Sequence, residues 1–329
     1  MKKYFIFFLI YFIFSNKLLF SQSSFKDIPD TDGLSKVTAY QIWNKEHLSE
    51  LSDSLYEDAF RTDCWHWEKH FILMQDIDFI TREECLGLFN GYFHGNGKKI
   101  TLVDTDGWAF FSMLYGTIDS LNVDGYVNGG AGIVASVMGS SYYIKKSGVV
   151  INCVNNATIY TNGAIDNITG KLVGLSAGVA YYNYYGGTIS NCINNGDITG
   201  VDNVGGIAGE NSGTIINCIN TGKITATNSG SQPNGAGGVG GIVAYGSVSN
   251  CINLGSVVGQ NNVGGIVGLG VQSIVSNCIN YGFINGIGKV GGICGSSSHI
   301  IFSGVSISNS VNVGVVEGEE DIGSIVGKE

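Results

Sequence analysis

GTISNCINNGDITGVDNVGGIAG, residues 187–209, decides the fold, because near-copies of it fill the second half of the chain. Each copy is marked by an Asn-Cys pair, and the cysteine positions 153, 192, 218, 251, 278 and 310 (serine in the last copy) differ by 39, 26, 33, 27 and 32 residues. A period of about 20–50 residues is typical of solenoids, propellers and other repeat arrays. The pairs are Asn152-Cys153, Asn191-Cys192, Asn217-Cys218, Asn250-Cys251, Asn277-Cys278 and Asn309-Ser310.

Each copy divides into three short pieces, TISNCIN, DITG and VGGIAG, separated by Gly or Asn. Short pieces rich in Ile, Val and Thr and bounded by turn residues predict strands. Three such strands per repeat predict an all-β parallel β-helix, in which stacked coils share one apolar core. We expect Ile189, Ile193, Ile198 and Ile207, with their equivalents in other coils, to point into that core.

The Asn-Cys pair predicts a corner. Ile189 and Ile193 share parity along the strand and Cys192 does not, so we expect a bend near Asn191 and a hydrogen-bonded asparagine ladder there. The cysteines that recur at one repeat position predict a stack of buried thiols, because side chains on neighbouring parallel strands are too far apart for the Cβ separation of about 3.8 Å that a disulfide needs. The glycine pair at 205–206 suits a positive φ or a crowded backbone.

The first 21 residues predict a secretory signal peptide. Lys2 and Lys3 precede a short apolar run at residues 4–14, and small or polar residues follow, with cleavage expected after Ser21. The run is too short for a span of about 20 residues, so we expect no membrane insertion after cleavage. Loss of Lys2, Lys3 and Lys17 takes the formal charge from −10 to −13. An acidic exported chain predicts a secreted or cell-surface location and no nucleic-acid partner.

The remaining chain divides into three parts. Residues 22–39 predict a polar leader, residues 40–107 an N-terminal cap with the first strands, and residues 108–329 the β-helix. The cap contains an expected helix at 44–56, with Asn44 as N-cap and Leu48, Leu51 and Leu55 on one face. Such a helix would cover the open end of a solenoid. Strands are expected near 70–79 and 99–103, with a turn at 95–97.

The unit VGGIAG…GTIINCINTGKIT resembles the GLUG-motif repeat family of secreted bacterial surface proteins. The segments LMQDIDF (73–79) and FNGYFHGNGKKI (89–100) resemble the region that often precedes those repeats. The family commonly has Asp where His94 stands, so the role of that acid does not carry over. The resemblance covers nearly all of residues 40–329 and implies secretion, a right-handed parallel β-helix and a surface or adhesive role, without a shared chemistry.

One polar cluster leaves two alternatives open. Cys64, His66, His70 and Cys85 offer zinc-binding atoms, but their spacing does not match known zinc loops. In an exported chain a Cys64–Cys85 disulfide is the competing interpretation. We expect no metal and no other cofactor.

The coils are compatible with two functions, a carbohydrate enzyme and a binding scaffold. Parallel β-helices include carbohydrate lyases and hydrolases, whose sites need clustered ionisable groups, yet no arginine follows Arg82 and charges are scarce beyond residue 148. We therefore expect a non-enzymatic binding scaffold, with a weakly active or inactive carbohydrate enzyme as the alternative. Insertions at 161–171, 179–185 and 227–238 indicate loops on a binding side. An aromatic platform for an extracellular protein or glycan is expected at Tyr142, Tyr143, Tyr181, Tyr182, Tyr184 and Tyr185.

Overall fold

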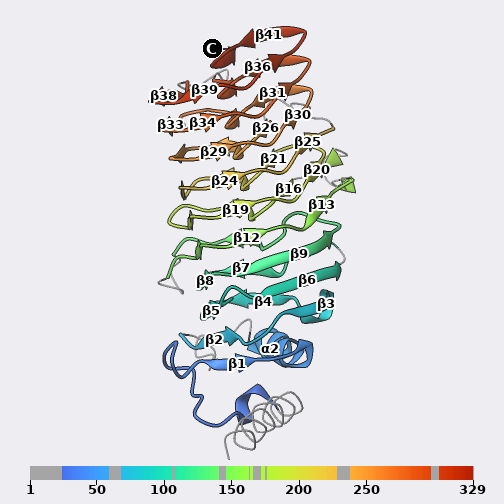
Figure 1. The fold of residues 1–329 in the computed structure, drawn as a ribbon, viewed down its shortest axis with the longest axis vertical. Helices are drawn as coiled ribbons and strands as arrows, with labels where there is room; N and C mark the ends of the chain where they lie inside the picture. Colours follow the sequence, from blue (N-terminus) through green and yellow to red (C-terminus); the bar gives the residue numbers. More distant parts are fainter. Residues whose placement is uncertain are drawn as a thin grey trace, which may run out of the picture.

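The computed structural model is a parallel β-helix closed at its N-terminal end by a short helix (Figure 1). Its coils stack in sequence order along the long axis of the molecule. The structure describes residues 24–58, 68–105, 107, 109–140, 146–162, 164–165, 172–174, 176–227, 238–297 and 304–328. In this part of the chain no helix is both long and apolar enough to cross a membrane.

Four parallel sheets run along the solenoid. Sheet 1 is β1 (Tyr40–Ile42), β2 (His70–Leu73), β5 (Tyr92–His94), β8 (Thr117–Asp119), β11 (Val149–Ile151), β18 (Thr188–Ser190), β23 (Thr214–Ile216), β28 (Val248–Ser249), β33 (Ile274–Ser276) and β38 (Ser306–Ser308). Sheet 2 is β4 (Leu86–Phe89), β7 (Phe111–Leu114), β10 (Val134–Val137), β17 (Ala180–Asn183), β22 (Ala208–Asn211), β27 (Val243–Gly246), β32 (Val267–Leu269), β37 (Cys294–Ser296) and β42 (Val326–Lys328).

Sheet 3 has two arms that meet at the long strand β9 (Asn122–Val127). One arm is β12 (Val154–Asn155), β19 (Ile193–Asn194), β24 (Ile219–Asn220), β29 (Ile252–Asn253), β34 (Ile279–Asn280) and β39 (Val311–Asn312). The other is β13 (Thr158–Tyr160), β20 (Ile198–Gly200), β25 (Ile224–Ala226), β30 (Val257–Val258), β35 (Ile284–Asn285) and β40 (Val316–Glu317), and β6 (Lys99–Asp104) with β3 (Ile77–Thr81) extends the sheet below β9.

Sheet 4 is β16 (Ser176–Ala177), β21 (Val204–Gly205), β26 (Val239–Gly240), β31 (Asn261–Gly264), β36 (Gly288–Gly291) and β41 (Glu320–Gly323). A small antiparallel pair, β14 (Ala164–Ile165) and β15 (Leu172–Val173), stands apart from these sheets. One coil therefore runs from sheet 1 through both arms of sheet 3 and sheet 4 to sheet 2. The parallel β-helix is confirmed, but each coil of the repeat has five short strands and not the expected three, because the pieces TISNCIN and VGGIAG each divide into two strands.

The expected corner is confirmed. Asn191 has a φ of 53°, and its equivalents Asn152, Asn217, Asn250, Asn277 and Asn309 have φ between 48° and 56°. This left-handed conformation is one that Asn tolerates better than most residues. The chain turns there from sheet 1 into sheet 3.

The bend reverses which side chains face inward, and one expectation is wrong as a result. Ile189, Ile198 and Ile207 are fully buried, but Ile193 points outward and is only partly covered. Cys192 and Asn194 occupy the interior instead. A left-handed residue at the corner shifts the alternation by one position, so the side chain after Asn191 points inward.

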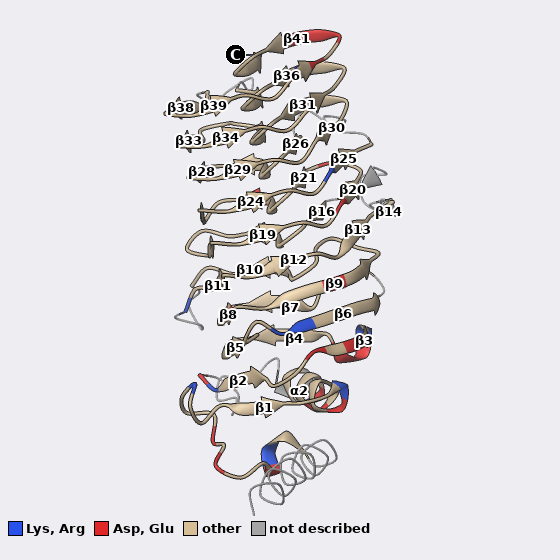
Figure 2. Ribbon diagram, viewed as in Figure 1, with Lys and Arg blue, Asp and Glu red and all other residues tan. Residues whose placement is uncertain are grey.

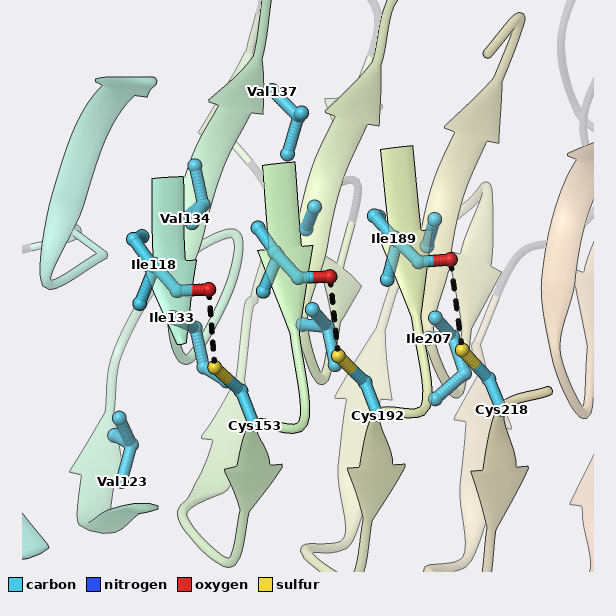
Figure 3. Packing of buried hydrophobic residues seen from close by; sticks show 14 of the residues in the cluster. Ile118, Val123, Ile133, Val134, Val137, Cys153, Ile189, Cys192, Ile207 and Cys218 are labelled. Carbon is cyan, nitrogen blue, oxygen red and sulfur yellow. Dashed lines mark hydrogen bonds between the residues drawn. The ribbon is translucent and has the colours of Figure 1, made fainter. Parts of the chain in front are cut away.

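The cysteines form the predicted stack of buried thiols (Figure 3). The Sγ atoms of Cys153, Cys192 and Cys218 lie 3.8, 3.6 and 3.9 Å from carbonyl oxygens of the preceding coil, those of Ile118, Val150 and Ile189. Each of these thiols also lies 3.3 Å from a carbonyl oxygen of its own coil. The contact with the Cys218 thiol and burial together raise the pKa of Cys251 to about 12. The column is a packed, unreactive part of the core.

The main asparagine ladder lies at another position than expected. The corner asparagines are exposed, and Asn217 donates to Asn191 across 3.2 Å. The continuous ladder is formed by the buried asparagine two residues after each cysteine. Each donates from Nδ2 to Oδ1 on the next coil, at 2.7–2.8 Å, along the series Asn155, Asn194, Asn220, Asn253, Asn280 and Asn312.

The same Nδ2 atoms also donate to a turn carbonyl of their own coil, as Asn220 does to Gly222 at 2.9 Å. Asn155 Oδ1 has no hydrogen-bond partner, because Val123 occupies the preceding rung and the ladder starts there. The glycine pairs fit beside the ladder through crowding and not through positive φ. A Cβ on Gly206 would lie 2.1 Å from the carbonyl oxygen of Gly241 and 2.6 Å from Cγ of Asn220.

The cap helix is confirmed as α2 (Lys45–Asp58). The Asn44 side chain accepts a hydrogen bond from the His47 amide at 2.8 Å, and Leu48, Leu51 and Leu55 are buried. The leader, by contrast, is more than a polar tail. Its short helix η1 (Phe25–Asp27) buries Phe25 completely, with ring-centroid distances of 5.6 Å to Tyr40 and 6.0 Å to Phe71. Residues from 24 onward therefore belong to the cap.

Candidate functional site

A cluster of tyrosines lies on strand β17 and the turn after it. Ala180 and Asn183 of this strand are buried, whereas Tyr181 and Tyr182 face outward. The rings of Tyr181 and Tyr182 meet edge to face at 4.4 Å, and those of Tyr182 and Tyr184 are stacked at 5.4 Å. Tyr184 is 43% exposed and Tyr185 is 87% exposed. The structure therefore brings Tyr181, Tyr182 and Tyr184 together beside sheet 2, and Tyr185 follows them in the exposed turn, while Tyr142 and Tyr143 lie outside the described residues.

The next coil places a carboxyl beside these rings. Tyr182 pairs with Glu210 of β22, and Glu210 pairs with Tyr245 of β27, so the three side chains form one outward column. Adjacent parallel strands are roughly 4.8 Å apart, which sets the spacing of the column. The residues Tyr181, Tyr182, Tyr184, Glu210 and Tyr245, with Asn203, are called the tyrosine–Glu210 site below.

Asn203 holds the carboxyl in place. Its Nδ2 donates to Oε1 of Glu210 at 2.9 Å, and its Oδ1 accepts from the Gly238 amide at 3.1 Å. Asn203 has a φ of 48°, so it aims its side chain from a left-handed turn between β20 and β21. Because the Gly238 amide fixes the Asn203 side chain, the Glu210 carboxyl that Asn203 binds is preorganised for a ligand.

Burial raises the pKa of Glu210, and nearby Asp202, which is fully buried, raises it further. Burial also raises the pKa of the Tyr181 and Tyr182 hydroxyls, with Glu210 contributing. The phenols are therefore neutral hydrogen-bond donors at any physiological pH. The site combines apolar ring faces, hydroxyl donors and one partly desolvated carboxyl.

A second polar cluster lies on sheet 1 near the cap. His94 Nδ1 bonds Asp119 Oδ2, and His94 Nε2 lies 2.8 Å from Nδ1 of His70, with the two imidazole planes within 15°. Asp119 only accepts, so neutral His94 carries its proton on Nδ1 and His70 donates from Nδ1. The Tyr92 ring stacks on His70 at 4.3 Å.

This cluster ties the leader to the sheet. Lys36 Nζ lies 3.6 Å from Oδ1 of Asp119, and the His70 amide donates to the Gly33 carbonyl at 2.8 Å. Burial, His94 and Lys146 lower the pKa of His70. Burial favours neutral Asp119, but its hydrogen bond with His94 and the nearby Lys36 ammonium hold its pKa below the usual value. His94 thus takes part in a leader contact, which the sequence did not suggest.

The cysteine–histidine alternatives are only partly covered by the described residues. Cys85 is a buried free thiol that donates to the Thr81 carbonyl at 3.3 Å, with a pKa raised by burial to about 12, so the structure does not support its disulfide with Cys64. Cys64 and His66 lie outside the described residues, and His70 bonds His94. Across the part of the chain that is described, no group of three or more His, Cys, Asp or Glu is arranged to hold a metal ion.

The comparisons with known proteins bear on the fold alone. The chain is similar to the crystal structure of a provisionally assigned immunoglobulin A1 protease from Bacteroides ovatus, with a TM-score of 0.56 and 18% sequence identity, over 84% of this chain and 86% of that one. No family model matches the sequence, and no curated protein does either. The likeness shows a shared architecture.

Glu210, Asn203 and Tyr245 were not predicted as site residues. Glu210 is one of very few acids in the coils, and Tyr182, Tyr245, Leu269 and Ser296 occupy its position on other rungs, so an acid there was a usable signal. Aligning the coils strand by strand would have placed it between Tyr182 and Tyr245. Asn203 and its equivalent Asn262 both precede Val-Gly-Gly and are left-handed, a conformation that Asn tolerates, but its contact with Glu210 could not be predicted without the structure.

Proposed function

We propose that the protein is an exported, non-enzymatic scaffold, secreted or held at the cell surface, that binds an extracellular glycan at the tyrosine–Glu210 site. The observation that carries the proposal is the cluster of tyrosine rings beside the Glu210 carboxyl, which Asn203 holds in place. The resemblance to GLUG-motif surface proteins and the signal-like residues 1–21 support export.

A glycan suits this site because aromatic side chains offer an apolar face with a polar tip. The side chains of Tyr184 and Tyr185 are exposed to solvent, and the hydroxyls of Tyr181 and Tyr182 are neutral donors. A sugar presents C–H groups on one face of its ring and hydroxyls at its edge. Those features complement the rings and the polar atoms of Asn203 and Glu210.

The distribution of charge favours binding over catalysis. Charged residues in the described chain gather near the cap and on the last coil, with few between (Figure 2). Among the described residues from 148 to 316 the ionisable Asp, Glu and Lys side chains are Asp197, Asp202, Glu210, Lys223 and Lys289. A protease activity, as named for the structural relative, would need a nucleophile with a neighbouring base, or a bound metal, at corresponding positions of this chain.

Binding to a glycan array tests the proposal. Tyr184→Ser with Tyr185→Ser should abolish binding, whereas Tyr160→Ser should leave it intact, because Tyr160 is equally exposed, at 43%, but lies on sheet 3. Binding that survives the double change would refute the site. Release of new reducing ends from a bound glycan would refute the non-enzymatic part of the proposal.

A further inference from the structure

We propose that the tyrosine–Glu210 site selects a cationic amino sugar, with the ammonium group beside Glu210 and the sugar ring against the exposed tyrosines. The inference rests on the proposed function and names the class of glycan. It follows from the contacts of one carboxyl and from the rings that surround it.

Among the residues that the structure describes, Glu210 has no cationic partner. It accepts one hydrogen bond from Asn203, at 2.9 Å, and forms no ion pair with any residue that the structure describes. Lys289 lies three rungs further along the solenoid. Val204 pairs with Val239, Val239 with Val263, and Val263 with Val290, which is next to Lys289. A partly desolvated carboxylate without a counter-charge is costly, and a ligand that supplies the charge relieves that cost.

The surroundings also favour positive charge. Tyr182 and Tyr245 flank Glu210 on the two neighbouring rungs, and the negative face of an aromatic ring attracts an ammonium group. Asp202, near Glu210, adds to the local negative potential. The chain has a formal charge of −10, so its long-range field attracts cations and repels acidic sugars.

An amino sugar fits better than a lysine side chain. Tyr182, beside the carboxyl, stacks on Tyr184, which is 43% exposed, and Tyr185 follows it in the turn at 87% exposed. A lysine side chain would place its ammonium at Glu210 and leave those rings uncovered. A hexosamine oligosaccharide supplies the charge and also successive ring faces for the outer tyrosines.

The probe is a glucosamine tetrasaccharide, compared with its uncharged N-acetylated counterpart, by titration calorimetry on the whole protein at a pH where the amines are protonated. We expect the charged ligand to bind at least tenfold more tightly, with an affinity that falls as salt rises. Glu210→Gln should remove that preference and the salt dependence, because it keeps the shape and the contact with Asn203. Glu317→Gln, the same change of charge on exposed β40, should do neither.

The outcomes separate the two proposals. Equal binding of both tetrasaccharides, lost on Tyr184→Ser, would overturn the amino-sugar inference and leave the glycan scaffold standing. Tighter binding of tetralysine than of either sugar would overturn it in favour of a basic peptide. Binding of no probe would overturn the amino-sugar inference, and the glycan array then decides the scaffold proposal separately. Circular dichroism of Glu210→Gln establishes that the variant is folded, and a preference that persists in the folded variant would refute the role of Glu210.

Discussion

Asn220→Asp probes the buried ladder without changing the size of the side chain. Asn220 donates from Nδ2 to Oδ1 of Asn253 at 2.8 Å and to the Gly222 carbonyl at 2.9 Å, and it accepts from Asn194 at 2.7 Å. A carboxylate retains the acceptor and loses both donated bonds. Two buried acceptors, on Asn253 and Gly222, are then left without a donor.

Each orphaned buried group costs about 1–3 kcal/mol, so Asn220→Asp should destabilise the fold by about 2–6 kcal/mol. Burial of an unpaired charge adds to the loss at neutral pH. Protonation restores one donor, so the folded state raises the pKa of the new carboxyl above its unfolded value of about 3.9. The variant is therefore least impaired in acid, and its deficit grows as pH rises through that raised pKa.

The assay is the midpoint of urea unfolding across pH, with hydrogen exchange to locate the loosened coils. Asn217→Asp is the matched control, since it adds the same charge at the exposed corner of the same coil, in a left-handed conformation that Asp also tolerates. We expect its effect to stay within about 0.5 kcal/mol. Equal losses in the two variants would refute the argument from hydrogen bonding.

Three further predictions concern the cap and the core. Because the pKa of His70 is lowered in the folded chain, the unfolded chain binds that proton first, so the unfolding midpoint should fall as pH drops below about 6.5; His70→Phe should flatten this dependence, and a dependence unchanged in that variant would contradict the role of His70. The seven free cysteines of the described residues should resist a thiol reagent in the native protein and react after denaturation without reductant, whereas no gain would indicate disulfides. Phe25→Ala should lower the free energy of unfolding by about 3–5 kcal/mol, because Phe25 is fully buried, whereas Leu34→Ala should change it little, because Leu34 is 69% exposed. An unchanged stability of Phe25→Ala would mean that the leader is not part of the fold.

The fold was predictable because the spacing of the Asn-Cys pairs gives the length of one coil directly. The strand pieces, the corner at Asn191 and the buried column at Cys192 followed from spacing and residue type. The inward direction of Ile193 did not, since the left-handed corner changes the alternation after it. For the same reason the ladder was expected at Asn191 and is found at Asn194.

The site was less predictable, because it depends on which coils are adjacent. The tyrosines of residues 181–185 are visible as a run, but Glu210 becomes their neighbour only through the register of β17 and β22. The leader gave a similar difficulty. Phe25 is a lone aromatic in a polar segment, and its burial depends on contacts with Tyr40 and Phe71 from later strands.

The aromatic residues in the first coils have a consequence for the register in which the coils pair during folding. Near-identical rungs can pair one coil out of step, because every Ile, Cys and Asn would still meet its own kind. The first coils hold bulky rings instead, and smaller residues occupy the equivalent positions of later coils, where Phe93 is followed by Ile118 and Val150, and Phe111 by Val134 and Ala180. These rings fix a unique starting point, so rungs added from that end have a single alignment available to them.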